Sequence, residues 1–219
     1  MKTIGWYFDF VSPFSYFQLE AFNRLPPGIV VTLHPVLFAG LLSHWGHKGP
    51  AEIPEKRRFT YRFLQWLAER DNVPLKFPPV HPFNPIKALR LAIVAGNGIE
   101  PVKTIFRHIW RDGKSIDDEK QWTELCKNVG VTDADTMISD PKIKDELKRN
   151  GERAVAAGLF GVPSFMIDGE IFWGFDATGM VVDYLRDPQR FRMGELGRVA
   201  DLPIGVERVR KERQYAKVP

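Results

Sequence analysis

The stretch Ser12-Pro13-Phe14-Ser15 directly follows an apolar run, Ile4–Val11. The run mixes aromatic and β-branched residues, a composition typical of a strand buried on both faces. Serine followed by proline is favoured at a helix start, because the serine hydroxyl caps the first turn and the missing proline N–H is not needed there. We therefore predict a strand that passes directly into a helix, with Ser12 as the N-cap.

The next segment along the chain completes a β-α-β unit. Leu25-Pro26-Pro27-Gly28 ends the helix, and Ile29–Leu33 has the composition of a second strand. In the C-terminal part, Ser164–Ile167 and Glu170–Trp173 flank the turn Asp168-Gly169. This pattern predicts a β-hairpin.

The section between these two parts has helical patterns. Apolar residues recur at helical spacing, and one helix is predicted to begin at the capping pair Asn84-Pro85. A last helix is expected from about Thr178 to Leu185. This order of elements predicts an α/β, thioredoxin-like fold interrupted by an all-helical insertion domain. Residues 1–36 and 155–190 would form the thioredoxin-like domain, and residues 37–154 the insertion.

Composition excludes several functional classes. The 219 residues are 44% hydrophobic, enough for one well-buried domain or for one domain that carries an insertion. The net charge is +4, and residues 206–219 contribute +3 of it (five basic, two acidic). We predict a solvated basic extension over residues 191–219, in preference to a tail that contacts nucleic acid or membrane. Because no signal sequence and no membrane span is recognisable, a cytoplasmic protein without nucleic-acid or membrane partners is expected.

Cysteine and histidine usage argues against a metal site. The single cysteine, Cys126, excludes an internal disulfide and a cysteine-based zinc site. Its neighbours Trp122 and Leu125 predict a buried, unreactive thiol on an apolar helix face. His44 and His47 lie three residues apart, but no cysteine or acidic cluster nearby completes a ligand set. No metal is therefore predicted.

Two further motifs flank the hairpin. Gly161-Val162-Pro163-Ser164 precedes its first strand, and the proline is either a cis residue or a trans residue at a strand start. A cis bond would leave the backbone N–H and C=O of Val162 free to pair with an extended peptide. Trp173-Gly174-Phe175-Asp176 ends the second strand. Asp176 either caps the last helix or helps to hold the charged end of an amino acid.

Together these motifs resemble the 2-hydroxychromene-2-carboxylate isomerases. This family is related to kappa-class glutathione transferases and to the DsbA-like branch of the thioredoxin superfamily. The resemblance rests on residues 7–16 (Tyr-Phe-Asp-Phe-Val-Ser-Pro-Phe-Ser-Tyr), on residues 160–163 and on Trp173-Gly174-x-Asp176. Where thioredoxin-like proteins carry Cys-x-x-Cys, this chain has Ser12 and Ser15. A hydroxyl forms no disulfide, but it can hold another molecule's thiolate at the positive end of a helix.

The resemblance implies glutathione as cofactor and assigns a role to each motif. Ser12 would be the catalytic residue that hydrogen-bonds the glutathione sulfur, and Val162 would pair with the cysteinyl backbone. The γ-glutamyl end would lie against Trp173, Gly174, Phe175 and Asp176. A homodimer is also expected from the resemblance.

The chain departs from the family pattern at two places. The usual asparagine of Gly-Asn-x-x-Pro is His47 here, in Gly46-His47-Lys48-Gly49-Pro50. Phe175 replaces a polar residue and Ala177 an arginine of the γ-glutamyl motif, so weaker glutathione binding or another thiol is an alternative. In the insertion, where such isomerases contact an aromatic carboxylate, His81 and Asn84 are candidate substrate ligands together with His47, although Asn84 also suits a pure N-cap.

The implied reaction is isomerisation. The thiolate adds to a 2-hydroxychromene-2-carboxylate, a double bond becomes rotatable, and elimination gives trans-o-hydroxybenzylidenepyruvate, as in naphthalene-type aromatic catabolism. Ser12 acts as a donor to sulfur, since no histidine or acid beside it in the sequence would activate it as a nucleophile. A kappa-type glutathione transferase or peroxidase is the alternative enzyme, and a non-catalytic thiol- or peptide-binding module is the third hypothesis.

Overall fold

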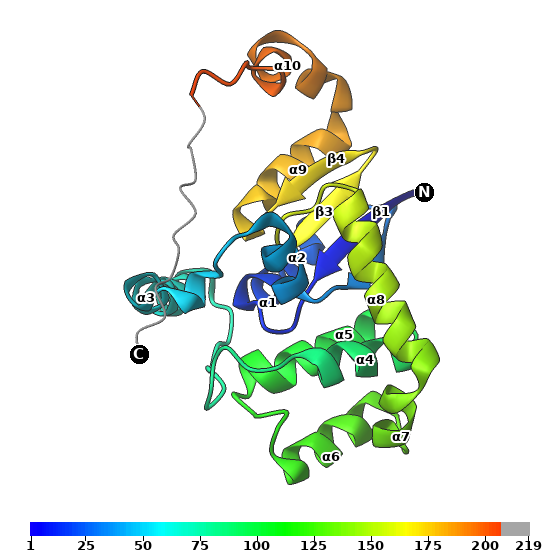
Figure 1. Cartoon of the computed structure of the whole chain (residues 1–219). Coiled ribbons are helices and arrows are strands. Elements are labelled where there is room, and N and C mark those ends of the chain that lie inside the picture. The colour runs from blue at the N-terminus through cyan, green and yellow to red at the C-terminus, as the bar shows by residue number, and fades with distance from the viewer. Residues whose placement is uncertain (207–219) are drawn as a thin grey trace, which may run out of the picture. The chain divides into compact units, whose positions relative to one another are not determined.

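A computed structural model describes residues 1–206 of the chain (Figure 1). The chain divides into two compact units, Met1–Val182 and Asp183–Pro219. The final part of the predicted basic extension, residues 207–219, lies outside the described residues. It includes five basic side chains: Arg208, Arg210, Lys211, Arg213 and Lys217.

The first unit is built on a four-stranded mixed sheet. Its strands have the order β2-β1-β3-β4, with β1 parallel to β2 and antiparallel to β3. Their bounds are β1 (Lys2–Phe8), β2 (Ile29–Pro35), β3 (Ser164–Ile167) and β4 (Glu170–Trp173). The β-α-β unit and the hairpin occur as predicted, and this arrangement confirms the thioredoxin-like fold.

Helix α1 (Pro13–Glu20) begins at the predicted proline, with Ser12 as its N-cap. The strand before it ends at Phe8, three residues earlier than the apolar run suggested. The reason is Asp9, whose backbone oxygen accepts a hydrogen bond from the Ser12 N–H at 3.0 Å. Asp9–Ser12 therefore forms a turn, called the Ser12 turn below.

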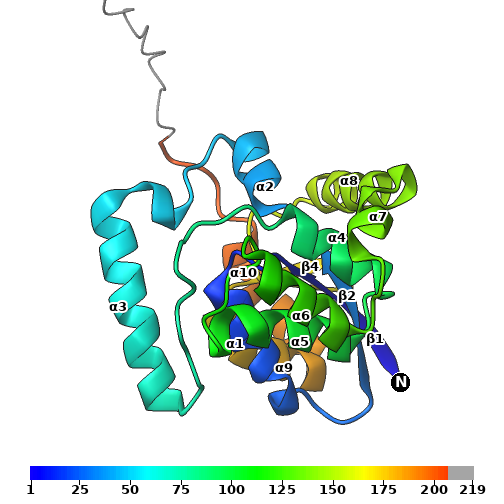
Figure 2. The ribbon, with the colours of Figure 1, turned by 90° about the horizontal axis from the view of Figure 1, so that it is seen from below.

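The insertion is helical, and α3 stands apart from its other helices (Figure 2). Its helices are α2 (Phe38–Trp45), α3 (Pro54–Asp71), α4 (Ile86–Val94), α5 (Ile99–Phe106), α6 (Glu119–Val129), α7 (Ala134–Ser139) and α8 (Pro141–Ala156). Helix α5 continues into a π-helical turn, Arg107–Arg111. Helix α2 was not expected from the sequence.

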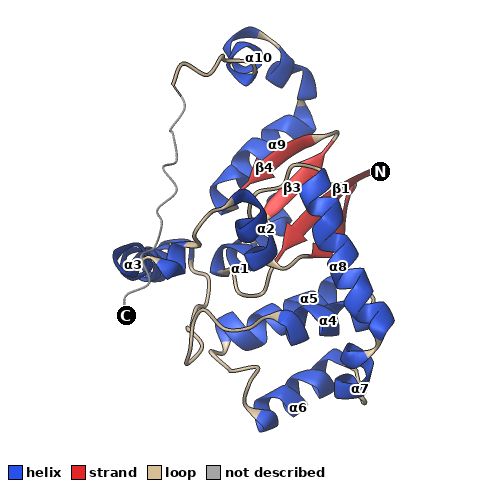
Figure 3. Cartoon of the chain, in the orientation of Figure 1, coloured by secondary structure: helices blue, strands red, loops and turns tan. Residues whose placement is uncertain are grey.

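Two helices follow the hairpin, which Figure 3 shows as the edge of the sheet. They are α9 (Thr178–Arg186), as predicted, and α10 (Gly194–Ala200), which the sequence did not indicate. Short 3₁₀ turns cover Phe22–Arg24, Pro50–Glu52, Phe175–Ala177 and Pro188–Arg192. Among residues 1–206, no helix combines the length and the apolar character that a membrane crossing requires.

Each face of the sheet packs against different helices, because side chains alternate along a strand. Trp6 and Phe8 are fully buried on one face, and the Phe8 ring lies 5.6 Å from that of Phe106 at the end of α5. On the other face, Tyr7 and Met166 pack against a buried cluster that joins α2 and α8. The insertion thus shares its core with the sheet.

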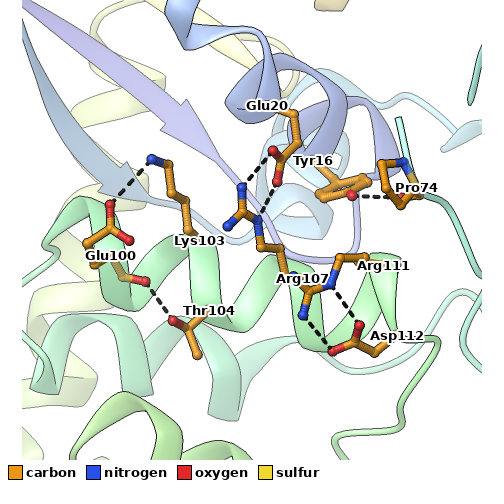
Figure 4. Close-up of polar contacts among 9 residues, drawn as sticks. All are labelled: Tyr16, Glu20, Pro74, Glu100, Lys103, Thr104, Arg107, Arg111 and Asp112. Carbon is orange, nitrogen blue, oxygen red and sulfur yellow. Dashed lines mark hydrogen bonds and ion pairs between the residues drawn. The ribbon is translucent and has the colours of Figure 1, made fainter. Parts of the chain in front are cut away.

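Polar contacts also join the insertion to α1 (Figure 4). Arg107 forms a bidentate ion pair with Glu20, with nitrogen–oxygen distances of 2.7 and 2.9 Å. The Tyr16 hydroxyl donates to the carbonyl oxygen of Pro74 at 2.6 Å. Bidentate arginine–carboxylate geometry is directional, so these contacts fix α1 against the π-helical turn and the segment after α3.

Candidate functional site

The Ser12 turn and the Val162-Pro163 bond lie at the same end of the sheet, where β1 finishes and β3 begins. Tyr7, near the end of β1, pairs with Ser164, the first residue of the antiparallel strand β3. The segment that follows β1 and the segment that precedes β3 therefore lie close together at this end of the sheet. The topology brings together two motifs that lie about 150 residues apart in the sequence.

Ser12 combines a capping role with a hydrogen-bond donor that remains available. Its Oγ accepts a hydrogen bond from the Ser15 N–H at 3.3 Å. A hydroxyl has two acceptor lone pairs and one proton, so the cap leaves the proton free to be donated. The N–H of Phe14, at the second helical position, makes no hydrogen bond within residues 1–206. Both groups suit an anion at the positive end of α1.

Ser15 is in a different environment. It is fully buried, and its Oγ has no hydrogen-bond partner among the described residues. Ser12 retains 7% exposure. Of the two serines that stand at the cysteine positions, Ser12 is thus the one closer to solvent.

The carboxyl group of Asp9 holds the Ser12 turn from inside. Asp9 is fully buried, and its two oxygens accept hydrogen bonds from the N–H groups of Val11 (3.0 Å) and Phe38 (2.8 Å). Burial raises the pKa of Asp9 from 3.8 to about 7, and the hydrogen bonds from backbone N–H groups oppose that rise. The bond to Phe38 caps the start of α2.

Two side chains of the insertion reach the carbonyl groups of the same turn. Trp110 Nε1–H donates to the Phe10 oxygen, and His81 Nε2 lies 2.8 Å from the Val11 oxygen. Because a carbonyl only accepts, His81 Nε2 carries a proton. His81 Nδ1 lies 2.6 Å from the Tyr61 hydroxyl, and burial lowers the pKa of His81.

The peptide bond between Val162 and Pro163 is cis, the first of the two alternatives that the sequence left open. Val162 is 7% exposed, yet its backbone N–H and C=O make no hydrogen bond within residues 1–206. Backbone groups with so little exposure are normally paired. The indole of Trp173 covers Gly161, where a β-carbon would lie 2.4 Å from the Trp173 Nε1. Glycine is needed there for this close packing.

Trp173–Asp176, called the distal segment below, is anchored by a buried glutamine. The Gln18 side chain donates to the Gly174 oxygen at 2.9 Å and accepts from the Trp6 indole at 2.7 Å. The Gly174 N–H donates to the Pro163 oxygen at 2.8 Å. The distal segment is therefore tied both to α1 and to the cis-proline.

The side chains of the distal segment differ in their exposure and in their contacts with the rest of the protein. Asp176 is exposed, and its carboxylate makes no hydrogen bond within residues 1–206, so it does not act as a cap. Trp173 is 54% exposed. The Phe175 ring packs 5.7 Å from that of Phe17 on α1 and borders a surface cavity of about 260 Å³. That cavity includes neither Ser12 nor Val162.

The predicted substrate ligands lie in three separate places. His47 is exposed in the loop after α2, and no side-chain contact within residues 1–206 joins it to the other predicted site residues. The Asn84 side-chain oxygen accepts a hydrogen bond from the Ile86 N–H at 3.1 Å, which is the capping role. Both His81 ring nitrogens already have partners in the chain, so a polar contact with a substrate would have to break one of them.

Cys126 does not take part in this site. It is buried on α6, and burial raises its pKa to about 11. At neutral pH it is therefore a protonated thiol. A thiolate at Ser12 would have to come from a bound molecule.

Sequence reasoning missed four residues that shape the site: Asp9, Gln18, Tyr61 and Trp110. Asp9 carried a signal, because a carboxylate inside an apolar run is either paired or functional. The other three act over 12 to 156 positions in the chain, and nothing local in the sequence shows their partners.

Fold and site together define a thioredoxin-like protein in which serines occupy the positions of the redox cysteines. A family model described as the DsbA-like thioredoxin domain matches residues 3–186. The chain belongs to the DsbA-like thioredoxin family, in the branch that holds the 2-hydroxychromene-2-carboxylate isomerases and kappa-class glutathione transferases.

Individual relatives agree with this placement. A 2-hydroxychromene-2-carboxylate isomerase of Sphingobium xenophagum is 30% identical over 194 residues, which cover 85% of this chain and 99% of that protein. Glutathione S-transferase kappa 2 of Caenorhabditis elegans is 27% identical and covers 89% of this chain and 96% of its own. A solved 2-hydroxychromene-2-carboxylate isomerase structure superposes with a TM-score of 0.77 at 21% identity, over 86% of this chain and 96% of that one. The homology supports a glutathione-related isomerase or transferase role.

Proposed function

We propose that the protein is a glutathione-dependent isomerase of 2-hydroxychromene-2-carboxylate-type substrates, which acts in aromatic catabolism in the cytoplasm. The observation that carries the proposal is the state of Ser12. Its hydroxyl caps α1 through a lone pair and keeps its proton for a donor bond to sulfur. An isomerase relative at 30% identity supports the reaction type.

The residues present fit glutathione. Val162 has an unbonded backbone N–H and C=O that suit an extended cysteinyl segment. Asp176 has an unbonded carboxylate that suits an α-amino group. Trp173 and Gly174 would flank the γ-glutamyl end, and Phe175 brings no polar group to it.

The chain's own groups would favour thiolate over thiol. A free thiol has a pKa near ~8.5, and a helix N-terminus with a nearby donor lowers it toward ~3.5–7.5. Ser12 would donate to sulfur, and the Phe14 N–H would add the positive end of α1. When bound, glutathione supplies a thiolate that adds reversibly to a conjugated double bond, so that the bond can rotate before the thiol is eliminated.

Substrate contacts in this proposal come from the insertion. His47 and Asn84 are exposed and suit the carboxylate of an aromatic substrate, with Asn84 also capping α4. His81 would contact the substrate through its ring face, because both its nitrogens are engaged.

Thiol dependence and glutathione recovery test the proposal. The equilibration of 2-hydroxychromene-2-carboxylate with trans-o-hydroxybenzylidenepyruvate is followed by absorbance, with and without glutathione. We expect isomerisation that needs the thiol and returns all of it. Isomerisation at the same rate without any thiol would contradict the proposal.

A kappa-type glutathione transferase or peroxidase is the second candidate, because the curated relatives include kappa-class transferases. The recovery measurement separates the two, since a transferase consumes glutathione into a conjugate and a peroxidase oxidises it. A correctly folded protein that binds no glutathione by calorimetry would favour the third hypothesis, a non-catalytic binding module.

A homodimer is part of the proposal, and α3 supplies a suitable surface. Phe59 and Trp66 are 67% and 51% exposed, and Phe63 stacks between them. The start of the helix is basic, because Lys56, Arg57, Arg58 and Arg62 outnumber Glu55, and its end carries Glu69 beside the ion pair Arg70–Asp71. Antiparallel pairing about a two-fold axis would place Glu69 of one copy near the basic start of the other helix. Light scattering of Phe59→Ser should report a monomer.

A further inference from the structure

The two peptide planes that precede Ser12 are held at both ends. In the Phe10–Val11 peptide, the oxygen accepts from Trp110 Nε1 at 2.8 Å and the N–H donates to Asp9 Oδ1 at 3.0 Å. In the Val11–Ser12 peptide, the oxygen accepts from His81 Nε2 at 2.8 Å and the N–H donates to the Asp9 backbone oxygen at 3.0 Å. A peptide unit is planar, so fixing both its ends fixes its orientation.

The two donors on the oxygen side form one packed unit. The rings of His81 and Trp110 lie 5.3 Å apart with a T-shaped geometry. Trp110 is fully buried, and the Tyr61 hydroxyl holds the far nitrogen of His81 at 2.6 Å. All three residues belong to the insertion. The insertion therefore holds the Ser12 turn through hydrogen bonds from side chains that are packed against one another.

We propose that His81 and Trp110 are positioning residues of the thiol site. They orient the two peptide planes before Ser12, and so aim its hydroxyl and the start of α1 at a bound sulfur. The bound sulfur in this inference comes from the proposed function. Neither side chain touches the reacting atoms in this role, and misplacement of a catalytic group by about 1 Å can cost on the order of a hundredfold in rate.

Two substitutions at His81 separate its two hydrogen bonds. The glutamine amide nitrogen takes the place of Nε2, so His81→Gln keeps a donor for the Val11 oxygen. The asparagine side-chain oxygen takes the place of Nδ1, so His81→Asn keeps an acceptor for the Tyr61 hydroxyl and loses the contact with Val11. Trp110→Phe removes the indole donor and keeps an aromatic ring. His34→Gln is the control, since His34 is also half-buried and bonded to a hydroxyl, that of Thr32.

The first readout needs no glutathione. Amide hydrogen exchange by NMR follows the Val11 and Ser12 N–H groups in each variant, with Leu125 on α6 as an internal reference. We expect at least tenfold faster exchange at Val11 and Ser12 in His81→Asn and Trp110→Phe, and near wild-type rates in His81→Gln and His34→Gln. Unchanged exchange in a folded His81→Asn, or equal exchange in the asparagine and glutamine variants, would overturn the proposal.

The second readout is the ionisation of bound glutathione, followed by thiolate ultraviolet absorbance against pH. His81→Asn should raise the pKa of the bound thiol by about one unit and lower kcat about tenfold, and His81→Gln should restore both. A higher KM for the substrate alone, with exchange and thiol pKa unchanged, would mean a substrate contact and overturn the positioning role. A wild-type protein that bound no glutathione would overturn the proposed function, while the exchange rates would still decide whether the insertion holds the turn. If His81→Asn does not fold, Trp110→Phe and His81→Gln carry the same comparison.

Discussion

The two ends of the candidate site carry one aspartate each, in opposite surroundings. Asp9, in the Ser12 turn, is fully buried and holds two backbone N–H groups. Asp176, in the distal segment, is exposed and makes no side-chain hydrogen bond within residues 1–206. The carboxyl group of Asp9 is engaged in hydrogen bonds within the protein, and that of Asp176 is available to a ligand.

This difference separates catalysis from affinity. Groups fixed in a buried network cost no reorganisation during the reaction, so they are suited to stabilising charge that develops there. Exposed groups contact ligand in the ground state and the transition state alike, which affects KM more than kcat. Substitutions at the Ser12 turn should therefore lower kcat or stability, and those in the distal segment should change glutathione binding.

The largest effect is expected from Ser12→Ala. Loss of the donor to sulfur should lower kcat by about 10²–10³-fold, as for other single donors to a developing anion. Ser15→Ala is the matched control, because its buried hydroxyl has no partner and its removal should leave kcat nearly unchanged. Steady-state kinetics with glutathione measure both. Equal losses in the two variants would mean that the effect comes from packing.

Asp9→Asn tests the buried end through the pH dependence of stability. The pKa of Asp9 is about 7 in the folded protein against an ordinary 3.8, so between these pH values the folded state binds more protons than the unfolded state. The free energy of unfolding of the wild type should therefore fall as pH rises from about 4 to about 7, by up to about 1.4 kcal/mol per pH unit from this group. Asparagine does not titrate.

Urea denaturation of both proteins at several pH values measures that slope. The difference in unfolding free energy, wild type minus Asp9→Asn, should decrease steadily with rising pH. A constant difference across this range would show that the carboxyl group titrates near its ordinary value.

Asp176→Asn tests the exposed end. Loss of one charge-assisted contact with an α-amino group should raise the KM for glutathione about tenfold, equivalent to about 1.4 kcal/mol, while kcat at saturation changes little. Asp145→Asn, at an exposed position on α8, serves as control. A fall in kcat with unchanged KM would place Asp176 in the chemistry and remove the contrast between the two ends.

The smallest effect is expected from Phe175→Ser. The hydroxyl should strengthen glutathione binding a few-fold, since one neutral hydrogen bond contributes about 0.5–1.5 kcal/mol. The lost ring contact with Phe17 should lower the thermal midpoint slightly, because an aromatic pair contributes about 0.5–1.5 kcal/mol. Calorimetry and thermal unfolding measure the two effects. Weaker binding in the variant would mean that the Phe175 ring itself contacts glutathione.

Much of the fold could be predicted from the sequence because its signals are local. The Ser12-Pro13 helix start and the hairpin turn at Asp168-Gly169 are specified by neighbouring residues. Helix α2 could not be predicted in this way, because its first N–H is capped by Asp9, which lies 29 residues earlier. The same aspartate ends β1 at Phe8, although the apolar run in the sequence continues to Val11.

In the candidate site too, features set by neighbouring residues could be predicted and features set by distant residues could not. The cis-proline and the capping role of Ser12 follow from short motifs, and the structure has both. The partners of His81 could not be foreseen, because Val11 and Tyr61 lie 70 and 20 positions away. A histidine in a loop looks available for substrate until its tertiary neighbours are known.

The place of β1 in the sheet has a consequence for the order of folding. Its parallel partner β2 begins about 20 residues later, whereas its other partner, β3, begins more than 150 residues later. Pairings across such long loops carry a high entropic cost and form late. During synthesis, the β1–α1–β2 unit and the insertion helices leave the ribosome well before β3 does. The end of the sheet that carries the candidate site is therefore expected to be completed last, after the insertion helices have been synthesised.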